Sequence, residues 1–205
     1  SLGCELTPFQ VKRDRVAENS DQMVTSAMDL SAPTFNFLEL LHHGTRVPEA
    51  VAVAKESEAV VLVLGLDETV EGEEMFGGSD EFANGDKKTL LLPSNQRELL
   101  DAVLAVGKPT TVVLLSGSAL AVDDDRIDAL VQAWYPGAVG GQAVGELLFG
   151  AYSPSGRLPV TFYRSLDDLP AFTDYDMKNR TYRYYEGEAL YPFGYGLTYG
   201  KVVCE

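Results

Sequence analysis

Continuous runs of hydrophobic residues recur at strand length from residue 47 onward. They lie at 59–65 ("AVVLVLG"), within 108–117 ("KPTTVVLLSG", entered through Pro109) and, less clearly, within 127–137 ("IDALVQAWYPG"). Runs of this length without polar alternation are typical of strands buried on both faces of a parallel sheet. A further short strand is predicted for "GRLPVTF" at 156–162.

Hydrophobic residues at helical spacing lie between these runs. The pattern predicts helices over 47–57, over 94–107 and over 138–150, with Ser94 as an N-cap and Gly107 and Gly150 as stops. A shorter helix is predicted at 36–44 ("NFLELLHHG"). Strands alternating with helices through short connections predict an α/β fold. It has a mainly parallel sheet with helices on both faces, an α/β sandwich.

The two ends of the chain differ from this regular centre. Residues 1–46 are mostly polar and predict little regular structure, so we place the α/β domain at 47–205. Residues 172–199 are crowded with Tyr and Phe and interrupted by Gly and Pro. We expect an irregular, aromatic-rich C-terminal segment that wraps the sheet and is pinned by buried rings. A stacking surface for sugar rings is the alternative.

An acidic stretch follows the first predicted strand. "DETVEGEEMFGGSDEFANGDKK" (67–88) has eight acidic residues among 22. In α/β sheets, ligands bind at the carboxyl ends of the strands, so this stretch begins where a functional site is expected. An acidic loop that contains glycines is also an ordinary solvated turn, and composition alone does not separate the two.

Composition narrows the choice of partners. The 205 residues carry a net charge of −15, which disfavours binding to nucleic acid and to anionic membranes but not to a neutral sugar. The same charge also serves solubility alone. His42 and His43 are adjacent and make a poor metal pair, and we expect neither a metal nor a cofactor. Cys4 and Cys204 can form a disulfide only if the two termini lie close together, and the sequence leaves this open.

Several long motifs, in order, resemble glycoside hydrolase family 3. They are "VLGLDETVEGEEM", "GDKKTLLLPSNQRELLDAV", "AWYPGAVGGQAVGELLFGAYSPSGRLPVTFY", "LPAFTDY" and "MKNRTYRYYEGEALYPFGYGLTY", which together cover roughly 47–199. The resemblance is to the α/β-sandwich domain that follows the barrel in this family. It implies an exo-acting, retaining β-glycosidase of the β-glucosidase or β-xylosidase type, with a β-linked oligosaccharide or glycoside as substrate.

The resemblance also implies which residues act. The sandwich domain of many members supplies the general acid/base from a pattern that resembles E-x-E, a loop and D-R. Here Glu71 and Glu73 form the pair, and Asp86-Lys87 stands where D-R is usual. We expect Glu73 to be the acid/base. Glu71 is the second candidate for this role and Glu74 is the third. Neighbouring carboxylates raise each other's pKa, which suits a proton donor.

No segment resembles the barrel, which would carry the nucleophile. We therefore expect the chain to be the carboxyl part of a larger enzyme, to be inactive alone, and to present a sheet edge or face to its barrel domain. Oligomerisation stays open, and so does localisation, with secretion and the periplasm among the options. The alternatives are a non-catalytic scaffold domain that completes the barrel and a carbohydrate-binding module.

Overall fold

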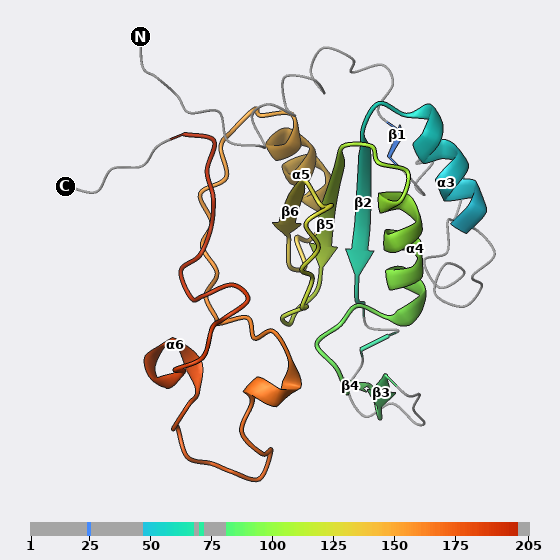
Figure 1. Ribbon diagram of the computed structural model, residues 1–205. Coiled ribbons are helices and arrows are strands. Elements are labelled where there is room, and N and C mark those ends of the chain that lie inside the picture. The colour runs from blue at the N-terminus through green and yellow to red at the C-terminus, as the bar shows by residue number, and fades with distance from the viewer. Residues whose placement is uncertain (1–23, 26–46, 68–69, 72–80, 201–205) are drawn as a thin grey trace.

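The structure is a computed structural model that describes residues 24–25, 47–67, 70–71 and 81–200. Its central feature is a parallel sheet of four strands in the order β1-β2-β5-β6. The strands are β1 (Val24–Thr25), β2 (Val60–Gly65), β5 (Thr110–Leu115) and β6 (Ala129–Gln132). The predicted mainly parallel sheet is confirmed (Figure 1).

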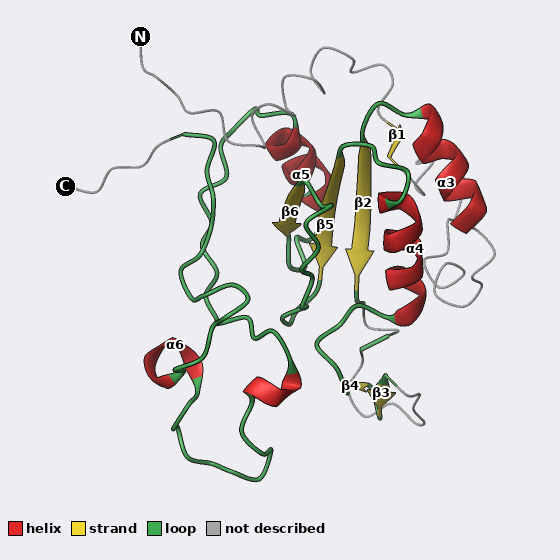
Figure 2. Ribbon diagram, in the orientation of Figure 1, coloured by secondary structure: helices red, strands yellow, loops and turns green. Residues whose placement is uncertain are grey.

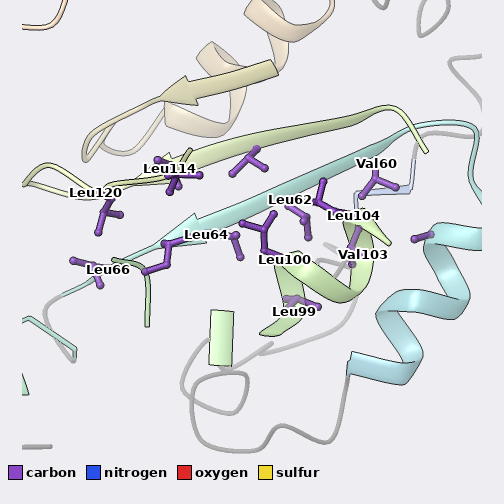
Figure 3. Packing of buried hydrophobic residues seen from close by; sticks show 14 residues of the cluster. Val60, Leu62, Leu64, Leu66, Leu99, Leu100, Val103, Leu104, Leu114 and Leu120 are labelled. Atoms are coloured by element: carbon purple, nitrogen blue, oxygen red, sulfur yellow. The ribbon is translucent and has the colours of Figure 1, made fainter. Parts of the chain in front are cut away.

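Helices cover both sides of this sheet. α3 (Val47–Glu56) and α4 (Ser94–Leu104) lie on one side, and α5 (Gly140–Leu148) lies on the other (Figures 1 and 3). The three predicted helices are therefore confirmed. The expected cap is wrong by one residue, because Pro93 is the N-cap of α4 and Ser94 is already helical. The helix expected at 36–44 lies outside the described residues.

The hydrophobic core lies between the sheet and the two helices α3 and α4. Val60, Leu62 and Leu64 alternate along β2 and point toward α4, whose Leu99, Leu100, Val103 and Leu104 meet them (Figure 3). Val61 and Val63, on the opposite face of β2, are only half-buried. Within the described residues, β2 is thus fully buried on one face, whereas its uninterrupted apolar run predicted two.

Strand β1 shows that residues 1–46 are not wholly irregular. Val24 and Thr25 pair in parallel with Val60 and Val61 of β2. The sequence around them is polar and mixed, so neither a run nor an alternation marked this short strand. It lies at one edge of the four-stranded sheet, beside β2.

The carboxyl third of the chain is irregular, as predicted (Figure 2). After α5, the helices among its described residues are η2 (Leu166–Asp168) and α6 (Thr181–Tyr184). The strand predicted at 156–162 is wrong, since only Phe162 forms an isolated antiparallel bridge, with Tyr191. Pro159 lacks the N–H that a continuous ladder needs.

The expectation that buried rings pin this segment holds for only part of it. Phe162 and Tyr199 are buried, and the Tyr199 hydroxyl donates a 2.7 Å hydrogen bond to the Leu147 carbonyl. Phe172 and Tyr175, in contrast, are 96% and 91% exposed. The segment is therefore anchored at a few points and leaves most of its aromatic rings uncovered.

Candidate active site

The acidic stretch begins at the carboxyl end of β2, where the backbone is held tightly. Gly65 has a φ of 146°, and a Cβ at this position would lie 1.8 Å from the Leu115 carbonyl oxygen of β5. Only glycine fits so close an approach. The next residue, Leu66, donates from its N–H to the same Leu115 oxygen at 2.7 Å. The strand end is thus fixed against β5 before the acidic residues start.

Gln96 of α4 clamps the same point. Its Oε1 accepts from the Gly65 N–H at 2.8 Å, and its Nε2 donates to the Gly65 carbonyl at 2.7 Å. The side chain is buried, so these bonds satisfy both polar groups of Gly65 away from water. Sequence reasoning missed this residue. Its spacing of three and four residues before Leu99 and Leu100 places it on the buried face and could have revealed it.

Glu71 is the one predicted acid/base candidate that the structure describes. Its N–H donates to the Asp67 carbonyl at 2.9 Å, shortly after the end of β2. Its half-buried carboxylate accepts a 3.4 Å hydrogen bond from the hydroxyl of Ser118, in the loop after β5. Glu71 therefore bridges the ends of two neighbouring parallel strands, at the edge where a ligand is expected.

Lys87 brings a positive charge to this edge. Its half-buried ammonium donates to the Ala119 carbonyl at 2.8 Å, next to Ser118. Burial lowers the pKa of Lys87, and the negative charge of Glu71 partly opposes this, which leaves the pKa below its usual value. Lys87 thus lies next to the loop that holds Ser118 and is influenced by the charge of Glu71.

A hairpin carries Lys87 to this position. It consists of β3 (Phe82–Ala83) and β4 (Asp86–Lys87), and its turn residues Asn84 and Gly85 both have positive φ angles. Two such residues are what a tight two-residue hairpin turn requires.

The hairpin is fastened to the start of α4 through Glu81. This carboxylate accepts from the N–H and the hydroxyl of Ser94, both at 3.0 Å, and pairs with Arg97 at 2.9 Å. Burial acts to raise the pKa of Glu81, but the hydrogen bonds from Ser94 and Arg97 outweigh it and the net shift is downward. Glu71 and Glu81 flank the middle of the acidic stretch. Both are anchored near the carboxyl ends of the strands.

The structure thus brings Glu71, Ser118 and Lys87 together. The other two predicted candidates, Glu73 and Glu74, lie outside the described residues. Within the part of the chain that the structure describes, no cluster of three His, Cys, Asp or Glu residues could hold a metal ion. None of the described helices is long and apolar enough to cross a membrane.

Known proteins match this chain over most of its length. The family model for the glycosyl hydrolase family 3 C-terminal domain matches residues 4–199. The chain belongs to glycosyl hydrolase family 3. The resemblance inferred from the motifs is thereby confirmed, and the match also takes in most of the stretch before residue 47 that we found hard to interpret.

The relatives in this family are named as glycosidases. A xylan 1,4-β-xylosidase of Xylanibacter ruminicola is 48% identical over 153 residues, covering 74% of this chain and 18% of the relative. A periplasmic β-glucosidase of Salmonella typhimurium is 36% identical over 167 residues, covering 75% and 20%. The chain therefore spans about a fifth of the length of these relatives.

Solved structures agree with these relatives. A family 3 exo-β-xylosidase, in complex with a xylobiose aziridine activity-based probe, superposes with a TM-score of 0.65 at 30% identity. The match covers 77% of this chain and 21% of that one. The family 3 chain described here is thus an α/β domain of the kind found at the C-terminal side of glycoside hydrolases.

Proposed function

We propose that this domain supplies the general acid/base carboxyl to an exo-acting, retaining β-glycosidase of the β-xylosidase or β-glucosidase type. The sugar would be held by a barrel domain elsewhere in the complete protein. One observation carries the proposal: the E-x-E segment starts at the carboxyl end of β2, with Glu71 tied to Ser118 and close to Lys87.

The position of Glu71 bears on which carboxyl donates the proton. A general acid must come within hydrogen-bond reach of the glycosidic oxygen in the bound substrate. Glu71 is half-buried, and its carboxylate accepts a long, 3.4 Å hydrogen bond from the hydroxyl of Ser118. This supports Glu73 as the acid/base, with Glu71 as the residue that fixes the start of the loop and Glu74 as the third candidate.

The reaction needs a second carboxylate. In retaining glycosidases, one carboxyl protonates the leaving oxygen while a carboxylate about 5–5.5 Å away attacks the anomeric carbon. The first residue then takes a proton from the water that hydrolyses the glycosyl-enzyme. Under this proposal the domain described here provides only the first group, and the domain alone does not turn over substrate.

The test is Glu73→Ala in the complete protein, assayed on aryl β-xylosides and β-glucosides whose phenol leaving groups differ in pKa. Loss of the acid slows the poor leaving groups most, because they depend on protonation, so the ratio of kcat/KM between good and poor leaving groups rises. Asp80→Asn, in the same acidic stretch, is the matched control and keeps the wild-type ratio. Equal rates for wild type and Glu73→Ala on all substrates would leave only the scaffold role.

A further inference from the structure

Four consecutive residues of the loop that follows β5 are each contacted by a polar or aromatic group from elsewhere at the carboxyl edge. We call residues 116–119 the support loop. At its start, Ser116 is fully buried, and its hydroxyl donates to the Ser118 carbonyl at 2.8 Å. The side-chain amide of Gln132, at the end of β6, donates to the Ser116 hydroxyl oxygen at 3.1 Å. The support loop is thus tied to the neighbouring strand at its first residue.

An aromatic ring lies against the second residue of the loop. A Cβ at Gly117 would lie 2.9 Å from Cε2 of Tyr135, which is too close for van der Waals contact. Tyr135 follows β6, and the residue before it, Trp134, has a φ of 56°, an unfavourable angle for a bulky side chain. The glycine therefore allows the ring to pack directly on the backbone of the support loop.

Lys87 holds the last residue of the loop. Its ammonium donates to the Ala119 carbonyl at 2.8 Å, from a hairpin that lies beyond the ends toward which the strands point (Figure 1). The next residue, Leu120, is fully buried, and the Ala121 N–H donates to the Leu90 carbonyl at 2.6 Å. The support loop is therefore fixed at its far end as well.

Ser118 connects the support loop to the acidic stretch. Its hydroxyl donates to the Glu71 carboxylate at 3.4 Å, which is long for a hydrogen bond and weak by itself. A contact of this kind places the carboxylate only if the hydroxyl is itself kept in position by its surroundings. The position of Glu71 therefore depends on the residues that hold the two ends of the loop.

The setting of Lys87 differs from that of an ordinary surface lysine. A lysine usually keeps its ammonium in water and covers apolar surface with its stem. Here burial lowers the pKa of Lys87, and the charge of Glu71 opposes that shift. Desolvation of the ammonium is thus offset by two interactions, a hydrogen bond to the loop and an attraction to the carboxylate that the loop contacts.

We infer that Lys87 is a positioning residue for the proposed reaction. Its ammonium holds the support loop at Ala119 and attracts the carboxylate of Glu71, and the loop presents Ser118 to that same carboxylate. Glu71 is thereby kept in one place shortly after β2, where the acid-bearing segment starts. The inference rests on the proposed function, although the positioning of Glu71 can be tested without activity.

The principal test is Lys87→Met in the complete protein, because methionine keeps most of the apolar stem and removes the charge. We expect the ratio of kcat/KM between good and poor phenol leaving groups to rise several-fold on aryl β-xylosides or β-glucosides. An acid whose segment has shifted protonates the leaving oxygen less well, and poor leaving groups depend on that proton most.

The ratio separates positioning from mere stability, since a loss of folded enzyme lowers both rates alike. Lys55→Met, at an exposed position of α3, is the matched control and keeps the wild-type ratio. A wild-type ratio in Lys87→Met, alongside a raised ratio in Glu73→Ala, would overturn the inference.

Ser118→Ala shows whether Lys87 acts through the support loop. We expect this variant to raise the ratio as well. The double variant Lys87→Met/Ser118→Ala should raise it by less than the product of the two single effects, because both changes release the same carboxylate. Effects that multiply would show that the two residues act independently, which would overturn the route through the loop.

Amide hydrogen exchange of the complete protein gives a readout that does not depend on activity. The N–H groups of Val70 and Glu71 both donate to the Asp67 carbonyl, so their exchange reports how firmly the start of the acidic stretch is held. A peptide that covers both residues should exchange several-fold faster in Lys87→Met than in the wild type. Unchanged exchange would overturn the inference.

The two readouts distinguish failure of this inference from failure of the proposed function. Faster exchange in Lys87→Met with a wild-type ratio, while Glu73→Ala raises the ratio, would reduce the lysine to a structural role and overturn the inference. A wild-type ratio in Glu73→Ala would instead count against the proposed function. Exchange alone would then decide whether Lys87 positions Glu71.

Discussion

The β2–α4 core and the irregular segment 172–199 are both rich in large hydrophobic side chains, yet the core is buried and most of the aromatic rings of the segment are exposed. Leu62 in β2 is 1% exposed, and Leu197 in the segment 172–199 is 68% exposed. The core finds its partners within this chain, because α4 lies across β2. Hydrophobic content alone therefore does not tell which side chains are buried, because burial depends on the tertiary contacts that each segment makes.

The largest expected effect comes from a matched pair of leucines. Leu62→Ala should lower the free energy of unfolding by about 2–5 kcal/mol, because it removes buried contacts and leaves a cavity in a packed core. Leu197→Ala in the same 205-residue chain should change it by less than about 0.5 kcal/mol. Urea denaturation measures both, and equal losses would refute the contrast between the two regions.

The next effect concerns the clamp that joins the core to the candidate site. Gln96→Leu removes both hydrogen bonds to Gly65 and leaves a buried N–H and carbonyl unsatisfied, which should cost about 1–3 kcal/mol. Gln142→Leu on α5, whose side chain is exposed and bonds only Glu146 among the described contacts, is the control. A loss for Gln142→Leu as large as that for Gln96→Leu would argue against a specific clamp.

A smaller effect on stability is expected on the other side of the sheet, where α5 lies. Gly145 lies in α5, and a Cβ at this position would meet nothing within 4 Å. Gly145→Ala should therefore raise the free energy of unfolding of this chain by about 0.5–1 kcal/mol through helix propensity. A decrease, measured by urea denaturation, would show that another segment packs against this glycine.

The smallest effect is the pH dependence of the Glu81 anchor. Because the pKa of Glu81 is lowered below the ordinary 4.5, its stabilising contribution is present above that pH and is lost as pH falls through the lowered value. Arg97 is about half exposed, so Glu81→Gln should cost less than about 1 kcal/mol.

The unfolding free energies of the wild type and Glu81→Gln should accordingly differ at about pH 7, and the difference should shrink as pH falls through the lowered pKa of Glu81. Glu98→Gln, an exposed position on α4, serves as the control. A difference between wild type and Glu81→Gln that persists unchanged at the lower pH would show that the carboxylate charge is not what anchors the hairpin.

The sequence predicted the central elements well because their periodicity is local. β2, β5 and α4 follow directly from their apolar spacing, and the acidic stretch was correctly placed at a strand end. The strand expected at 156–162 failed because a ladder needs a series of paired residues. Here Phe162 forms an isolated bridge with Tyr191, and the backbone of Leu158 bonds separately to Gly194 and Tyr195.

The contacts of the candidate site were beyond local patterns. Ser118 is 47 positions from Glu71, and Gln96 is 31 positions from Gly65. No periodicity links residues so far apart, so the anchoring of Glu71 and of the strand end emerges only when the sheet is assembled. The exposure of the aromatic rings was not predicted for a similar reason. Aromatic residues favour burial, but the local sequence does not show whether another segment of the chain packs over them.

The proposal that this domain donates an acid/base to a neighbouring domain is tested most directly by azide rescue. Glu73→Ala in the complete protein, given an activated aryl glycoside, should form the glycosyl-enzyme but release it slowly, because no base activates water. Added azide needs no base, so it should restore the rate and yield a glycosyl azide of retained β configuration. Absence of both the rate increase and the β-glycosyl azide, with full activity retained, would contradict the account.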